Sequence, residues 1–218
     1  MKQSNTRNKL SVICALLIII FTVWSVTDMF LHVGSGNMQV SRAVVFRYFT
    51  VDSNILSAVS VLALLIWRLT GSGRKRPAGE VPAALTALRF MGAVSVTVTL
   101  MTVLCFLGLL YGYASMFAGW NFYLHLAGPL LSIAAFVWFD PGKSLPGKMV
   151  WTSLIPTALY GAVYLYLVVV VGADNGGWPD FYGFNIGGRW MISLAAMLLA
   201  TLLIGIVLHL ARKKAGRK

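Results

Sequence analysis

The sequence predicts an all-α integral membrane protein, a bundle of six transmembrane helices that forms one domain over residues 1–218. Two features of the composition lead to this prediction: 58% of the 218 residues are hydrophobic, and only 11% are charged. A soluble domain carries about 25% charged residues, so this chain lacks the polar residues to cover a soluble surface. Its high hydrophobicity also excludes a disordered chain.

Six long apolar runs follow one another along the chain. Their approximate bounds are 10–31, 44–69, 84–112, 121–139, 150–172 and 190–210. About 20 apolar residues cross the hydrocarbon core of a bilayer as a helix, and each run reaches about that length. Continuous apolar runs differ from the alternating pattern of a membrane β-barrel. No repeat or long linker divides the chain, so a single domain is expected.

The basic residues orient the predicted bundle, because loops on the cytoplasmic side carry an excess of lysine and arginine. If the helices alternate in direction, most basic residues fall on the side of the two termini: Lys2, Arg7, Lys9, Arg68, Arg74, Lys75, Arg76, Lys143, Lys148, Arg212, Lys213, Lys214, Arg217 and Lys218. The opposite loops hold only Arg42, Arg47 and Arg189. Both termini are therefore expected to be cytoplasmic, in a plasma (inner) membrane.

The predicted topology explains the formal net charge of +12. In a soluble protein such a charge would indicate a nucleic acid partner. Here it marks the cytoplasmic face, with attraction to anionic lipid as a secondary effect. The expected partner is the lipid bilayer and not nucleic acid, and the oligomeric state stays open.

Polar residues inside the predicted spans are candidates for function, because ionisable groups are costly in a bilayer. The second and fourth spans both run inward, and Thr50 and His125 each lie a few residues below the outer boundary. At a rise of 1.5 Å per residue, both lie on the order of 6–9 Å deep. Asp28 and His32 end the first span at the same level.

Helical spacing groups several polar residues into three stripes. These stripes are Arg47, Thr50, Asn54 and Ser57 on the second span, Asn121, His125, Gly128 and Ser132 on the fourth, and Ser95, Thr99 and Thr102 on the third. Asp52 lies two residues from Thr50 and points elsewhere. Three polar stripes in one bundle predict a shared interior cavity.

Structural roles compete with functional ones at these positions. A threonine in a membrane helix commonly bonds the carbonyl of residue i−4, which is the alternative for Thr50. A lone histidine at membrane depth commonly joins two helices by a hydrogen bond, which is the alternative for His125. Arg89 near the cytoplasmic end of the third span is expected to snorkel toward the interface.

Two segments resemble a known family. They are Phe49-Thr50-Val51-Asp52-Ser53-Asn54-Ile55-Leu56 on the second span and His125-Leu126-Ala127-Gly128-Pro129-Leu130-Leu131 on the fourth. The Phe-Thr-x-x-Ser-Asn and His-x-x-x-Pro-Leu patterns are similar to landmarks of the androgen-induced gene 1 family, which includes the androgen-dependent TFPI-regulating protein. Leu88-Arg89 and the threonine-rich segment 96–102 are similar to the third span of that family.

The resemblance implies a six-helix intramembrane hydrolase that cleaves fatty acyl esters, such as fatty acid esters of hydroxy fatty acids, with a threonine nucleophile and a histidine. Carried onto this chain, Thr50 is the nucleophile and His125 the base. A threonine hydroxyl needs such a base to become nucleophilic, and the oxyanion formed needs aimed donors. Asn54 and Asn121 are the candidate donors. Arg47 and Asp28 are candidates for contacting the substrate, with orientation of His125 as a further role for Asp28.

Other functions stay open at this point. A transporter or channel would use Asp28, Asp52 and His125 as an ion path. A haem or quinone protein would use His32 and His125, since paired histidines can bind iron. A structural or assembly factor would need no chemistry. For the hydrolase, no cofactor and no metal are expected, and the substrate partner is an amphiphilic lipid ester.

Overall fold

The computed structural model describes residues 2–31, 42–70, 81–142 and 145–216. It confirms six helices long and apolar enough to cross a membrane, which makes the chain a multi-pass membrane protein. These spans are Thr6–Leu31, Phe49–Leu69, Ala83–Tyr111, Trp120–Phe139, Gly147–Val171 and Trp190–Ala215. They agree with the predicted runs to within about five residues at each end, and the largest differences are the later start of the second, at Phe49, and the later end of the sixth, at Ala215.

Several spans combine more than one type of helix. The first is α1 (Lys2–Leu31) and the sixth is α10 (Trp190–Ala215), while η1 (Arg42–Arg47) is a 3₁₀ turn that precedes α2 (Phe49–Leu69). The third joins α4 (Ala83–Thr102), the π-helical η2 (Val103–Leu107) and α5 (Gly108–Tyr111). The fourth joins α7 (Trp120–Phe122), π-helical η3 (Tyr123–Ala127), α8 (Gly128–Ala134) and π-helical η4 (Ala135–Phe139). The fifth joins the 3₁₀ turn η5 (Gly147–Ser153), α9 (Leu154–Leu165) and π-helical η6 (Tyr166–Val171).

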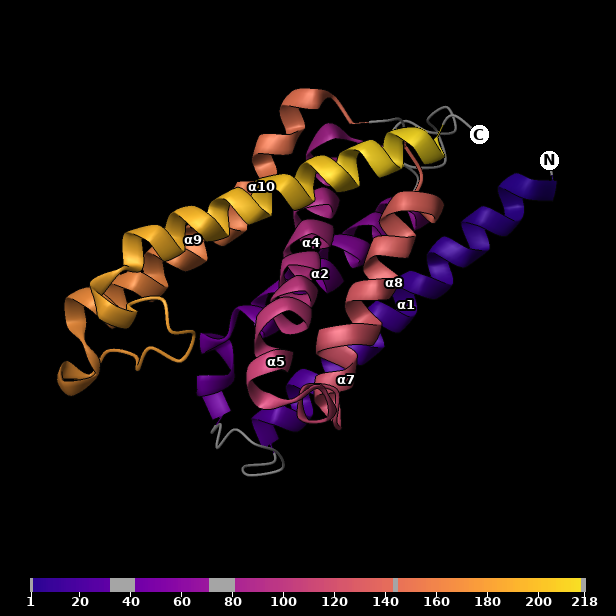
Figure 1. Ribbon diagram of the computed structural model, residues 1–218. Helices are drawn as coiled ribbons and strands as arrows, with labels where there is room; N and C mark the ends of the chain where they lie inside the picture. The colour runs from indigo at the N-terminus through magenta and orange to yellow at the C-terminus, as the bar shows by residue number, and fades with distance from the viewer. Residues whose placement is uncertain (1, 32–41, 71–80, 143–144, 217–218) are drawn as a thin grey trace.

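The spans form a bundle with α4 at its centre, in contact with α2, α8, α9 and α10. Both termini lie at one end of the bundle, here called the terminal end (Figure 1). The opposite end carries η1, the short helix α6 (Tyr113–Met116) and the loop 172–189. Toward that opposite end, α9 and α10 diverge from α2 and α4, as Figure 1 shows.

Close approach of α2 and α4 depends on Gly92. A Cβ atom at this position would lie 2.9 Å from Ser60 Oγ and 3.0 Å from Ser57 Cα. Small residues at such contacts let membrane helices approach closely, because lipid gives no hydrophobic driving force between them. The contact brings the polar side chains of α2 into bonding distance of α4.

A buried ion pair joins the third and fourth spans at the terminal end. Arg89 Nε donates to Asp140 Oδ2 at 2.7 Å, and both side chains are almost fully buried. Arg89 also donates to Ser132, at 3.0 Å to the hydroxyl and 2.9 Å to the carbonyl. Ser11 of α1 donates to Asp140 at 2.9 Å. The expectation that Arg89 snorkels is therefore wrong, because its guanidinium turns inward to a carboxylate that the sequence places 51 residues later.

Loss of this ion pair should destabilise the bundle strongly. Arg89→Ala leaves the Asp140 carboxylate buried without its cation, a change that costs about 3–5 kcal/mol in comparable sites. We expect the free energy of unfolding in detergent to fall by that amount. Lys213→Ala, which removes an exposed cation from the same end of the bundle, is the control. Equal stability of the two variants would contradict the role assigned to the pair.

Candidate functional site

Polar side chains of α2 bond to α4 and to the fourth span across the helix interfaces. Ser53 of α2 shares a hydrogen bond of 2.9 Å with Thr99 of α4. Ser57 of α2 shares one of the same length with Ser132 of α8. These side chains are buried, and their partners satisfy them within the bundle, as lipid requires. Direct contacts thus replace the predicted shared cavity at Thr99, Ser57 and Ser132, while Ser95 of the third stripe lines a cavity that the other two stripes do not reach.

Asn54 forms the link between α2 and the fourth span. Its Nδ2 donates to the carbonyl of Thr50 at 2.8 Å and to the carbonyl of Leu124 at 3.0 Å. In the π-helical turn η3, Gly128 N bonds the carbonyl of Tyr123, five residues back. The next bond in this register would run from Pro129 to Leu124, but proline has no N–H. Asn54 supplies the missing donor to Leu124.

His125 lies in the same π-helical turn and is buried. Its Nδ1 lies 2.9 Å from the carbonyl oxygen of Met116, the last residue of α6. A carbonyl only accepts hydrogen bonds, so Nδ1 carries the proton of the neutral ring and Nε2 keeps its lone pair. This tautomer is the one in which Nε2 can act as a base.

Thr50 lies in the first turn of α2 and is half-buried. Its carbonyl and that of Leu124 accept from the same nitrogen of Asn54, so the first turn of α2 lies beside the turn that carries His125. The structure gives no direct hydrogen bond between the side chains of Thr50 and His125 within the described residues. Pairing of these two residues as nucleophile and base stays a prediction.

The other predicted site residues are distributed around this contact. Asn121 donates a long bond of 3.5 Å to the carbonyl of Ser115. Asp28 is half-buried near the end of α1. Arg47 ends η1, and its guanidinium carbon lies 5.7 Å from the ring centroid of Trp178. His32, the other histidine of the haem hypothesis, lies outside the described residues.

The loop 172–189 folds back onto the beginning of α2 (Figure 1). The hydroxyl of Tyr182 accepts a bond of 3.0 Å from the Phe49 N–H, one of the N–H groups left open at a helix N-terminus. Burial raises the pKa of Tyr182 above its ordinary value, so the hydroxyl stays neutral. Asp180 fixes the loop, accepting bonds of 2.8 Å from the Tyr164 hydroxyl and from the backbone of Phe184 and Asn185.

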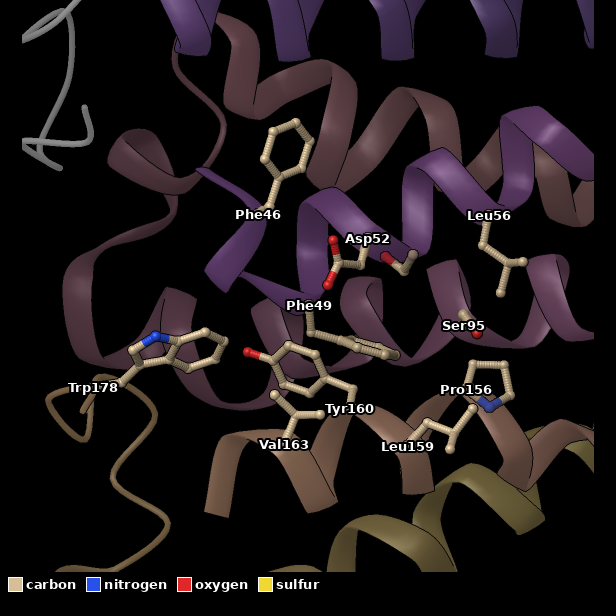
Figure 2. Close-up of a pocket in the computed structure, with 11 residues that line it drawn as sticks. Phe46, Phe49, Asp52, Leu56, Ser95, Pro156, Leu159, Tyr160, Val163 and Trp178 are labelled. Atoms are coloured by element: carbon tan, nitrogen blue, oxygen red, sulfur yellow. The ribbon is translucent and has the colours of Figure 1, made fainter. Parts of the chain in front are cut away.

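A cavity of about 320 Å³ lies where α9 diverges from α2 and α4. Its lining residues are Phe46, Phe49, Asp52, Ser53, Leu56, Ser95, Pro156, Leu159, Tyr160, Val163 and Trp178. Figure 2 shows the carboxylate of Asp52 directed toward the end formed by Phe46, Tyr160 and Trp178, with Leu56 and Pro156 at the other end. Neither Thr50 nor His125 lines this cavity.

Sequence reasoning gave Asp52 a role only in the transporter alternative and gave Trp178 no site role, although a periodic signal was present. On α2, Phe49, Asp52, Ser53 and Leu56 have the spacing i, i+3, i+4, i+7, which places them on one face. On α9, Pro156, Leu159, Tyr160 and Val163 repeat the same spacing. The sequence could have shown these faces, but not that they meet each other around a cavity.

No group of three or more histidine, cysteine, aspartate or glutamate side chains able to hold a metal ion occurs within the described ranges. The polar chemistry near Thr50 and His125 consists of hydroxyl, amide, imidazole and backbone carbonyl groups. Such a set suits proton transfer and hydrogen bonding to a substrate.

The Asn54 link can be tested with a double-mutant cycle. Asn54→Leu leaves the carbonyl of Leu124 without a donor and should lower the free energy of unfolding by about 1–3 kcal/mol. Pro129→Ala restores an N–H at the position from which Leu124 can be bonded. In that background Asn54→Leu should cost less, giving a coupling energy of about 1 kcal/mol.

Ser60→Ala is the control for this cycle, because among the described residues the Ser60 hydroxyl bonds only the carbonyl of Ser57 within its own helix. Its effect on unfolding should be the same with Pro129 or alanine at position 129. Strict additivity of Asn54→Leu and Pro129→Ala would refute the link.

Comparison of the chain with family models, with curated proteins and with solved structures gives no match. The resemblance to the androgen-induced gene 1 family therefore depends only on the two short patterns in the second and fourth spans and on the similar segments of the third. Asn54 from the pattern in the second span bonds the carbonyl of Leu124, the residue that precedes His125 of the pattern in the fourth. The activity that the resemblance implies is carried forward as a proposal.

Proposed function

We propose that this protein is an intramembrane lipid-ester hydrolase of the androgen-induced gene 1 type, with Thr50 as nucleophile and His125 as base. The observation that supports it best is the orientation of His125. The carbonyl oxygen of Met116 accepts the hydrogen bond from Nδ1 of His125, so Nε2 is the ring nitrogen that can accept a proton. Asn54 joins the turn that carries His125 to the first turn of α2, through its bonds to the carbonyls of Thr50 and Leu124.

The proposed reaction proceeds in two stages. In the first, the Thr50 hydroxyl attacks the ester carbonyl while Nε2 of His125 takes its proton, and the ester C–O bond breaks as that proton passes to the leaving alkoxide. In the second, His125 activates a water molecule that hydrolyses the acyl-threonine. Because the two side chains share no hydrogen bond here, the first proton transfer needs a rotation of Thr50 or one bridging water.

The oxyanion donors of this proposal are Asn54 and Asn121. Both bonds of Asn54 Nδ2 run to carbonyl oxygens in the present structure, so this residue must release one of them to serve the reaction. The bond of Asn121 to Ser115 is long, at 3.5 Å, and is the easier one to exchange. Arg47, at the same end of the bundle, would contact an anionic group of the substrate.

The proposed topology places the terminal end in the cytoplasm and the opposite end outside, across a plasma (inner) membrane. The basic residues support it through the positive-inside rule, since Arg212, Lys213 and Lys214 occupy the last turn of α10. In this orientation Thr50 and His125 lie in the outer half of the bilayer. The substrate class that fits is an amphiphilic fatty acyl ester whose chains stay in lipid.

A second candidate is a non-enzymatic membrane protein that binds a small amphiphile. One observation favours it: the cavity lies on the face of α2 that carries Phe49, Asp52 and Leu56, while Asn54 and Ser57 bond the fourth span from another face. Binding without turnover is the property that separates this candidate from the hydrolase.

The hydrolase proposal is tested by comparing wild type with Thr50→Val and His125→Gln in detergent micelles. Thr50→Val keeps the shape of the side chain and removes the nucleophilic oxygen. We expect both variants to lose covalent labelling by a fluorophosphonate probe and to hydrolyse fatty acyl esters at least about 100-fold more slowly. Thr50→Ser should retain measurable turnover, because it keeps the hydroxyl.

Thr97→Ala is the matched control, since in the described part of the chain the Thr97 hydroxyl bonds only the carbonyl of Ala93 in its own helix. It should label and turn over as wild type does. Undiminished labelling and turnover in folded Thr50→Val protein would exclude the nucleophile, and absence of turnover in wild type with every fatty acyl ester would favour the second candidate.

A further inference from the structure

We propose that the cavity between α2, α4 and α9 binds a phospholipid with a primary ammonium headgroup, of the phosphatidylethanolamine type. This inference depends on the cavity and its charges and does not require the hydrolase reaction; Arg47 is the one residue that both proposals use. It assigns a role to Asp52, to Trp178 and to the loop 172–189, none of which the proposed reaction uses.

Asp52 provides the first argument. Its carboxylate is half-buried within the cavity lining and makes no hydrogen bond or ion pair to any residue in the described ranges. A carboxylate among apolar walls is costly unless a cation or hydrogen-bond donors meet it. Figure 2 shows its oxygens directed into the space beside Phe46 and Tyr160, where a ligand can supply the missing donors.

Arg47 provides the opposite charge at the same end of the cavity. Its guanidinium lies over Trp178, a lining residue, and its carbonyl accepts a bond of 2.6 Å from the hydroxyl of Tyr160, another lining residue. Arg47 and Asp52 form no ion pair with each other among the described residues. Two opposite charges that do not neutralise each other at one opening match a zwitterion, with its phosphate near Arg47 and its ammonium near Asp52.

The rest of the lining suits an acyl chain. Leu56, Pro156, Leu159 and Val163 are apolar, and the side chains of Leu159 and Val163 stay largely exposed within the lining. A volume of about 320 Å³ is at the lower end for a ligand site. It therefore has room for a headgroup amine and part of one chain, while the remaining lipid stays in the bilayer.

The hydrogen-bonding capacity of the site selects a primary ammonium. The unpaired oxygens of Asp52 need N–H or O–H donors, which a primary ammonium has and a quaternary ammonium lacks. The lining aromatic rings of Phe46, Phe49, Tyr160 and Trp178 add cation–π attraction to either kind. Discrimination between the two headgroups thus depends on Asp52.

The proposal is tested by native mass spectrometry of the full chain in detergent, titrated with three lipids that carry the same acyl chains: phosphatidylethanolamine, phosphatidylcholine and phosphatidylglycerol. Wild type should bind phosphatidylethanolamine most tightly. Asp52→Asn should weaken that binding about tenfold and bring it to the level of phosphatidylcholine. Arg47→Gln should weaken both zwitterionic lipids. Asp174→Asn, which neutralises an exposed carboxylate of the loop at the same end, should change neither.

Leu159→Trp fills the apolar part of the cavity without touching a charge, and it should also weaken binding of phosphatidylethanolamine. Equal binding of phosphatidylethanolamine and phosphatidylcholine by wild type would overturn the proposal. Preference for phosphatidylglycerol, or unchanged binding of phosphatidylethanolamine by both Asp52→Asn and Leu159→Trp, would overturn it as well. Each readout is binding, so a negative result leaves the hydrolase assay unaffected, and the reverse also holds.

Discussion

The hydrocarbon core of a bilayer offers no water, so polar groups on these six helices must find partners within the bundle. This constraint explains the contact at the centre of the structure. Pro129 removes one N–H from the fourth span, the carbonyl of Leu124 is left open, and Asn54 closes it from α2. Asn54 also bonds the carbonyl of Thr50, so the requirement to satisfy one carbonyl links the first turn of α2 to the turn that carries His125.

Buried charged side chains have partners at the terminal end of the bundle, but Asp52 at the opposite end differs. Arg89 and Asp140 are buried and paired, with Ser11 and Ser132 completing the bonds around them. Asp52 faces a cavity and has no such partner in the described part of the chain. The contrast separates a structural role from a binding role, because an unpaired carboxylate is retained at a cost to stability that a ligand can offset.

The spans and the polar stripes could be predicted from the sequence, because the length of an apolar run and a period of 3.6 residues are properties of neighbouring residues along the chain. The sequence identified Asn54, Ser57 and Ser132 as facing inward, but it could not show that Ser57 bonds Ser132 and that Asn54 bonds a backbone carbonyl of the fourth span, instead of lining a cavity. Arg89 was assigned to the interface because its partner, Asp140, ends another span. The cavity itself depends on the divergence of α9 from α2, an angle between helices that no single segment encodes.

The ion pair between Arg89 and Asp140 has a consequence for biosynthesis. Arg89 leaves the ribosome 51 residues ahead of its partner, a delay of roughly 3–10 s at ordinary rates of synthesis. A lone arginine disfavours membrane insertion of the span that carries it. The third and fourth spans, joined by the short segment 112–119, therefore gain from entering the bilayer together as one helical hairpin, with the charge neutralised as the hairpin closes.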